Sequence, residues 1–182
     1  MSANETEKRR ELDSLSLKFK CGTAQDEERL RLAIIAGELR EKSRIDIVLR
    51  LTEDPNEQVR WYAVNSLARI DRSSEAVQIF WNIFEKDYDE EVRSMAIACI
   101  GTSLIGSLDK GAFMRLKTAL TEESSPFLRR SLYDALLMVA AVQPSEWSSV
   151  KSIMSRQRDP HKFKVDWAKV AELEEMILRE NP

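Results

Sequence analysis

The sequence predicts an all-α fold in which helical hairpins are repeated along the chain, and three observations predict it. Apolar residues recur at spacings of three and four in almost every segment, as on one face of an α-helix. The 182 residues include only 5 Gly and 5 Pro, so few positions interrupt a helix. Three apolar stripes begin at Val59, Val92 and Leu128, which are 33 and 36 residues apart. A period in this range, with two helices in each unit, is typical of a helical solenoid.

Two helices are expected before the repeats. Glu7–Phe19 has the pattern of a capping helix, and Asp26–Arg40 is helical with one apolar side. That side is formed by Leu30, Ala33, Ile34 and Gly37. The second helix is interpreted either as part of the cap or as a degenerate repeat.

Three hairpins are expected between residues 43 and 141. Their first helices are Ser43–Leu51, Ser74–Lys86 and Leu108–Leu120. Their second helices carry the three stripes, which consist of Val59, Ala63, Leu67 and Ile70, then Val92, Ala96 and Ile100, then Leu128, Leu132, Leu136 and Val139. Asp54 is the expected N-cap of the first stripe, with Pro55 in the first turn, and Ser125 and Pro126 have the same roles in the third.

The stretch DPNEQVRWYAVNSLARI resembles the second helix of a HEAT repeat, of the short kind also seen in phycobilin-lyase-like proteins. The family pattern is an acidic residue near the turn, then Val-Arg, then Ala, then Ala or Ser followed by Leu, and it corresponds here to Asp54, Val59-Arg60, Ala63 and Ser66-Leu67. The second unit repeats it with Asp87 or Asp89, Val92-Arg93, Ala96 and Cys99-Ile100. The third unit departs from it, with Glu123, Leu128-Arg129, Leu132 in place of Ala, and Ala135-Leu136.

This resemblance covers about residues 43–141 and implies a right-handed α-solenoid of HEAT-type hairpins with helical caps. It also implies that Arg60, Arg93 and Arg129 pair with acidic residues of the turns, which is a structural role. An arginine suits that role because its planar fork can bond carboxylates and carbonyls together. The second helices are then expected to line a concave binding face.

We predict a single domain over residues 1–182. Residues 1–42 form an N-terminal helical cap or degenerate repeat, residues 43–141 form about three repeats, and residues 142–182 form a C-terminal helical cap. In the last part we expect a helix at Ser145–Ser155 with Trp147, a linker at Gln157–Lys164 and a helix at Val165–Arg179. The candidate contacts of this last helix are Val165, Ala168, Leu173, Met176 and Ile177.

A ridge beside the core stripes is the candidate partner-binding surface. Helical phase places Trp61 and Asn65 off the stripe of their helix, and the repeat register gives Arg130 and Asp134 the same positions in the third unit. Tryptophan and arginine are enriched among residues that dominate binding energy. The alternative is that Trp61 packs between adjacent repeats. Core or seam positions are expected for the other tryptophans, which are Trp81, Trp147 and Trp167.

The charge distribution favours a protein partner. Residues 51–123 contain 13 Asp and Glu against 8 Lys and Arg, a net charge of −5. This argues against nucleic acid, whose phosphates require a basic surface, and it would complement a basic protein. The acidic run at Asp87, Asp89, Glu90 and Glu91 is interpreted first as a complement to a helix dipole and second as a docking patch.

No catalytic, cofactor or metal site is predicted. His161 is the only histidine, and no phosphate-binding glycine motif or paired-cysteine motif is present. The apolar runs are too short for a membrane span of roughly 20 residues, so we expect a cytoplasmic protein with reduced thiols. The predicted function is non-catalytic protein binding, as a scaffold, adaptor or inhibitor of the immunity type. The alternatives are HEAT-like enzymes, either a bilin lyase, against which a buried Cys99 would argue, or a DNA glycosylase-like nucleic-acid binder.

Overall fold

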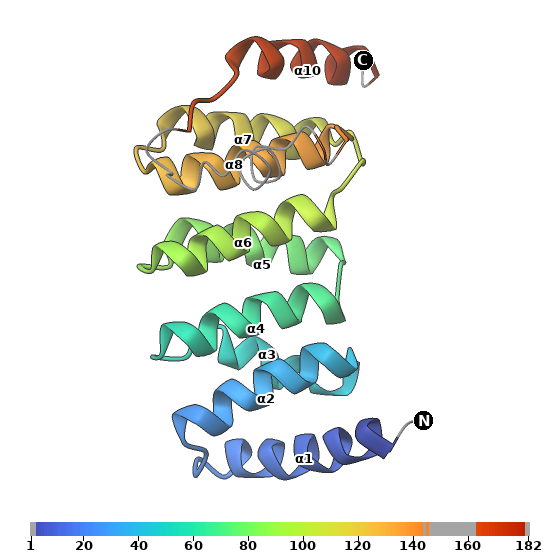
Figure 1. Ribbon diagram of the computed structural model, residues 1–182, viewed down its shortest axis with the longest axis vertical. Helices are drawn as coiled ribbons and strands as arrows, with labels where there is room; N and C mark the ends of the chain where they lie inside the picture. The colour runs from blue at the N-terminus through green and yellow to red at the C-terminus, as the bar shows by residue number, and fades with distance from the viewer. Residues whose placement is uncertain (1–2, 144, 146–162, 181–182) are drawn as a thin grey trace. The chain divides into compact units, whose positions relative to one another are not determined.

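The computed structural model describes residues 3–143, 145 and 163–180, which are almost entirely helical (Figure 1). Nine α-helices and one short 3-10 helix lie in this part of the chain, and none of its residues forms a strand. The all-α prediction is therefore confirmed, while the right-handed superhelix and the single domain stay predictions. The chain divides into two compact units, Met1–Ala96 and Ile97–Pro182.

The first unit opens with a hairpin of α1 (Ala3–Lys20) and α2 (Asp26–Leu39). Gly22 has a φ of +72° in the turn between them, a conformation that glycine adopts without strain. Gln25 and Glu28 form a capping box that satisfies backbone donors at the start of α2. Both expected helices are confirmed, and α1 extends beyond the expected range at both ends.

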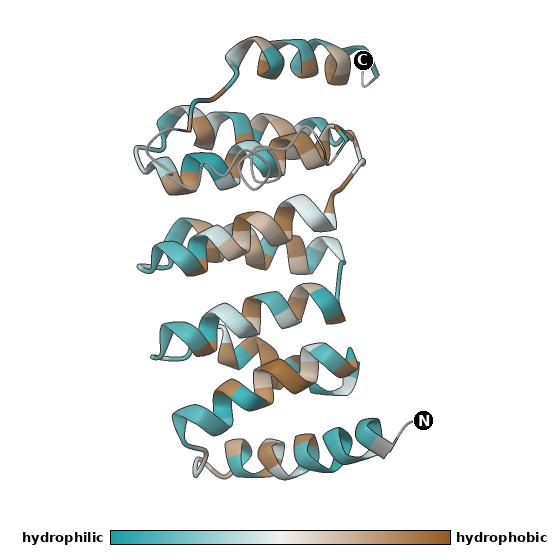
Figure 2. Ribbon diagram, viewed as in Figure 1, coloured by the Kyte–Doolittle hydropathy of each residue, from teal (hydrophilic) through white to brown (hydrophobic). Residues whose placement is uncertain are grey.

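Helix α2 has the register of a repeat's second helix. Its N-cap Gln25 precedes Arg29 by four residues, as the N-cap Asn56 of α4 (Glu57–Ile70) precedes Arg60. Figure 2 shows hydrophilic ends and a hydrophobic middle in α2. The buried residues are Leu32, Ala33, Ile35, Ala36 and Gly37. Of the expected apolar side, Ala33 and Gly37 are buried, while Leu30 and Ile34 are half-buried.

The expected Ser43–Leu51 helix is divided between a 3-10 turn at Lys42–Arg44 and α3 (Ile45–Leu51). In α4 the predicted stripe is confirmed, since Val59, Ala63, Leu67 and Ile70 are all buried. The predicted N-cap was wrong, because Asn56 and not Asp54 accepts hydrogen bonds from the backbone N–H groups of Gln58 and Val59. Pro55 therefore precedes the helix.

Helices α2 and α4 pack closely because small residues face each other. A Cβ added to Gly37 would lie 2.7 Å from Cβ and 2.9 Å from Cα of Ser66. The Ser66 hydroxyl donates a buried hydrogen bond of 2.7 Å to the carbonyl oxygen of Ala33. The missing side chain at Gly37 thus allows the two backbones to approach, and the serine hydroxyl is satisfied inside the contact.

The rest of the first unit follows the predicted order. Helix α5 spans Ser74–Lys86, as expected, and the Ser73 hydroxyl caps it. Phe80 and Trp81 are buried on its inner side. Helix α6 (Glu90–Ser103) contains the boundary between the units, and its predicted stripe of Val92, Ala96 and Ile100 is buried.

In the second unit, α7 (Lys110–Glu122) pairs with α8 (Pro126–Val139), and α10 (Trp167–Glu180) packs on α7. Ser125 caps α8, with Pro126 in its first turn, as predicted. Helix α10 buries Val170, Leu173 and Ile177, and Lys117 on α7 pairs with Glu174 at 2.6 Å. Ala168 is exposed, which contradicts its assignment as a contact, and Val170 takes that role.

The expected Ser145–Ser155 helix with Trp147, and most of the Gln157–Lys164 linker with His161, lie outside the described residues. Among the described helices, none has the length and apolar character needed to cross a membrane.

Candidate partner-binding surface

Arg60 is the centre of a buried network at the turns. Its Nε and Nη2 donate to the two carboxylate oxygens of Asp87 at 2.8 and 3.0 Å, and its Nη1 donates to the Asp54 carbonyl at 2.9 Å. The guanidinium also lies 4.3 Å from the ring centroid of Tyr88. Only 3% of Arg60 is exposed. Its donors are therefore occupied within the chain, and its predicted structural role is confirmed.

Arg29 repeats this arrangement one hairpin earlier, which the sequence reading missed. It donates to both carboxylate oxygens of Asp54 at 2.6 and 3.2 Å and to the Ala24 carbonyl at 3.0 Å. The bonds to Asp54 raise the pKa of the Arg29 guanidinium. The signal that could have found it is the four-residue spacing from N-cap to arginine, since Glu28 stands where the family pattern has Val.

The other two repeated arginines also bind backbone at their turns. Arg93 Nε donates to the Phe84 carbonyl at 2.9 Å, and Arg129 Nη1 donates to the Glu123 carbonyl at 3.0 Å. Of the two turn carboxylates considered for the second unit, Asp87 binds Arg60, while Asp89 caps the start of α6 through Glu91 N and Val92 N. Pairing with a turn carboxylate is therefore confirmed for Arg60, while for Arg93 and Arg129 the structure shows backbone contacts at the turns and their pairing with carboxylates stays a prediction.

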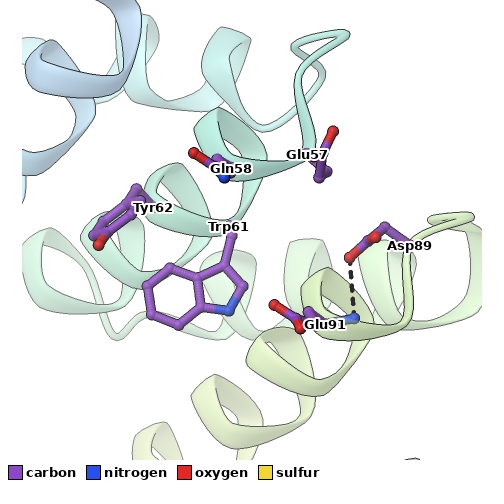
Figure 3. A pocket seen from close by; sticks show the side chains of 6 residues that line it. All are labelled: Glu57, Gln58, Trp61, Tyr62, Asp89 and Glu91. Atoms are coloured by element: carbon purple, nitrogen blue, oxygen red, sulfur yellow. Dashed lines mark hydrogen bonds between the residues drawn. The ribbon is translucent and has the colours of Figure 1, made fainter. Parts of the chain in front are cut away.

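A hollow of about 340 Å³ lies beside Trp61, between the first turns of α4 and α6. Figure 3 shows the indole between Tyr62 on one side and Glu91 on the other. The lining residues are Glu57, Gln58, Trp61, Tyr62, Asp89 and Glu91. Trp61 is half-buried and meets the Tyr62 ring edge-on, with centroids 4.8 Å apart and planes at 72°. Part of the indole is thus accessible within the hollow.

This hollow is acidic. Glu57 and Glu91 are exposed, and no described residue forms an ion pair or hydrogen bond with either carboxylate. Asp89 is half-buried and already accepts two backbone hydrogen bonds. All the lining residues are described, and none of them is basic. The walls therefore combine an aromatic face with negative charge that no side chain of the lining neutralises.

A larger hollow of about 570 Å³ lies beside Arg60 and Tyr88. Its three buried charged side chains are paired within the chain, since Asp54 binds Arg29 and Arg60 and Asp87 bind each other. Because these pairs already satisfy the three groups, the hollow at Trp61 is the better candidate for binding.

The four predicted site residues have different surroundings. Trp61 and Asn65 lie half-buried on α4, in the first unit. Arg130 is half-buried on α8, in the second unit, but Asp134 is only 8% exposed. The expectation that Asp134 faces outward was therefore wrong, because position 134 of α8 is covered as its apolar neighbours are. A common ridge of Trp61, Asn65 and Arg130 stays a prediction.

Leu30 and Ile34 of α2, which belong to the expected apolar side of that helix, are further candidates for contact with a partner. They lie five and nine residues after the N-cap Gln25, the same offsets as Trp61 and Asn65 from Asn56. Both are half-buried. The positions of α2 that correspond to Trp61 and Asn65 are therefore apolar and partly accessible.

The remaining tryptophans and the cysteines bear on the alternatives. Trp81 is buried as predicted, but Trp167 is 43% exposed, so its core assignment was wrong. Cys99 is buried, and desolvation raises the pKa of its thiol to about 12. A thiol that resists ionisation is a poor nucleophile for attaching a bilin.

The sequence profile of the HEAT repeats matches residues 22–101 and 46–137, which together cover more than half of the 182 residues. The first match includes α2, in agreement with the repeat register of that helix. No curated protein and no solved structure matches the chain significantly. The chain belongs to the HEAT-repeat family.

Proposed function

We propose that this chain is a non-catalytic protein-binding module whose contact surface is centred on Trp61. Its helical repeat scaffold is of a kind often used for protein binding, because stacked hairpins present successive second helices side by side. The observation that carries the proposal is the hollow at Trp61, where a half-buried indole lies beside two exposed carboxylates that bind no described side chain.

The indole is suited to be an anchor. The contact with Tyr62 holds it on one side, so little side-chain entropy remains to be lost when a partner binds. Aromatic residues in partly formed pockets are typical of positions that dominate interface energy. Asn65, one turn further along α4, can add a hydrogen bond, and Leu30 and Ile34 can extend the apolar contact along α2.

This proposal includes scaffold, adaptor and inhibitor roles, which differ in the partner and not in the surface. It places the partner on the second helices, which line the concave side in HEAT solenoids. A DNA glycosylase-like role receives less support, because the hollow beside Trp61 is lined by carboxylates that would repel phosphates.

The test starts from a partner captured with the native chain and compares two tryptophan variants by calorimetry. Trp61→Ala should weaken binding at least about thirtyfold, which corresponds to about 2 kcal/mol. Trp167→Ala is the matched control, since Trp167 is also an exposed indole but lies on α10. Arg130→Ala tests the predicted ridge. A folded Trp61→Ala variant that binds as tightly as the parent would contradict the proposal.

A further inference from the structure

The hollow at Trp61 has two independent properties that select a ligand. The first is geometric, since the indole forms one wall and the hollow has about 340 Å³, near the lower end of the range of about 300–1,000 Å³ for ligand sites. The second is electrostatic, since three of its six lining residues are acidic and none is basic. A flat apolar wall beside negative charge fits a group that is both planar and cationic.

We propose that this hollow binds an arginine side chain of a basic segment in the partner protein. The inference rests on the proposed function and adds the chemistry of the partner. A guanidinium can stack on the indole of Trp61 while its edge donates to the carboxylates of Glu57 and Glu91. Arginine fits better than lysine because its planar fork serves both walls at once, whereas an ammonium is a compact and more strongly hydrated charge.

The helix dipoles set a limit on this attraction. Glu57 and Glu91 stand in the first turns of α4 and α6, where the positive helix ends already favour negative charge. A dipole offsets about half an elementary charge at each end, and Asp89 also contributes to the hollow. The three carboxylates and the two helix ends together still give the hollow a negative net charge, so a cation is attracted.

The arginine–aspartate pairs at the turns explain why no internal cation of the described residues occupies the hollow. At the turns, Arg29 and Arg60 neutralise Asp54 and Asp87 inside the chain. Neither arginine lines the hollow, and its two exposed carboxylates bind no described side chain. The arginine of a partner would thus reproduce, between chains, the arginine–carboxylate pairing that the chain uses within itself.

The experiment uses the full chain, labelled with ¹⁵N, and three short peptides that differ at one position. The peptides are acetylated, amidated and built from Gly and Ser around a central Arg, Lys or citrulline, the last being a neutral analogue of arginine. The readout is the indole N–H resonance of Trp61, assigned by its loss in Trp61→Phe. We expect a saturable shift with the Arg peptide, a weaker one with the Lys peptide and none with the citrulline peptide.

Two variants test the carboxylates. Glu91→Gln should weaken binding of the Arg peptide by about threefold, as expected for one exposed charge pair. Glu90→Gln is the matched control, because it changes the same charge in the same helical turn but does not line the hollow, and it should leave the affinity unchanged. If both variants lost the same affinity for the Arg peptide, the peptide would be attracted by the general negative charge of the surface and not bound in the hollow. That result would overturn the proposal that the hollow binds arginine.

The peptide series separates this inference from the proposed function. Three results would overturn the proposal that the hollow binds arginine. They are a citrulline peptide that binds as tightly as the Arg peptide, a Lys peptide that binds as tightly as the Arg peptide, and the absence of a shift with any peptide. None of these results bears on whether Trp61→Ala loses the captured partner. If the Arg peptide binds as expected but Trp61→Ala retains the partner, the proposed function fails and the hollow is a cation site that this partner does not use.

Discussion

The arginines at the turns illustrate how much one side chain can contribute to this fold. Arg60 joins Asp87, the carbonyl oxygens of Asp54 and Pro55, and the hydroxyl of Tyr88. Since the side chains of Arg60 and Asp87 are 4% and 7% exposed, water can replace few of these contacts. Removal of either partner leaves the other charged group buried without its counter-charge.

We therefore predict that Arg60→Ala lowers the free energy of unfolding by about 3–5 kcal/mol. Arg69→Ala is the matched control, because Arg69 is an exposed arginine on the same helix, and it should change stability by less than about 0.5 kcal/mol. Urea unfolding followed by circular dichroism measures both values. Similar midpoints for Arg60→Ala and the parent would show that the network is not needed for stability.

At the scale of elements, close approach of second helices depends on small residues. Gly37 on α2 faces Ser66 on α4, and Gly101 on α6 faces Ala135 on α8, where an added Cβ would lie 2.9 Å from the Ala135 Cα. Both glycines lie twelve residues after an N-cap position, Gln25 or Asp89. Helices α2 and α6 thus have glycine at the same position of the repeat, and at both positions the neighbouring second helix passes closely.

We predict that Gly37→Ala destabilises the chain by about 1–3 kcal/mol, because the new Cβ would overlap Ser66. Alanine is the better helix former by about 1 kcal/mol, so the steric effect must exceed that gain. Gly111→Ala on α7 is the control, since its Cβ would meet only Asp109 Oδ1 at 3.4 Å. There the helix propensity should dominate and raise the melting temperature. A stabilised Gly37→Ala variant would contradict the close packing.

At the scale of the whole molecule, several carboxyl groups of the first unit have depressed pKa values. A hydrogen bond from Arg31 lowers the pKa of Glu11, and hydrogen bonds from Ser43 and Arg9 lower that of Glu41. Lys18 has the same effect on the pKa of Glu28. Because these pKa values are lower in the folded chain than in the unfolded one, the linked stability is present above about pH 4.5 and is lost as the pH falls through the folded values.

We predict that the melting temperature is nearly constant from pH 7 to pH 5 and falls by several degrees between pH 4.5 and pH 3. The exposed pairs should be screened by salt, so the fall should be smaller in 1 M NaCl. Calorimetry across this pH series measures the effect. A melting temperature at pH 3 equal to that at pH 7 would show that these pairs contribute nothing to stability.

Local patterns were enough to predict the helices and most of the core. Apolar spacing identified the stripe from Val59 to Ile70, and the Ser125-Pro126 pair identified the start of α8, because helix formation and capping depend on residues within about one turn. The pattern failed at α2, where Leu30, Leu32, Ile34 and Ile35 make more than one side apolar. Periodicity alone could not decide which of them face α4.

Which residues are buried, and which surface a partner can contact, could be decided only from the tertiary structure. The hollow at Trp61 exists because Asp89 and Glu91, about thirty residues later in the sequence, lie beside the first turn of α4. The burial of Asp134 and the exposure of Trp167 also depend on which neighbours cover them. The sequence by itself determined most of the helices, their repeat and the structural role of Arg60, since these follow from local spacing. Only the tertiary structure decided which polar and aromatic side chains remain accessible, because accessibility depends on residues distant in the chain.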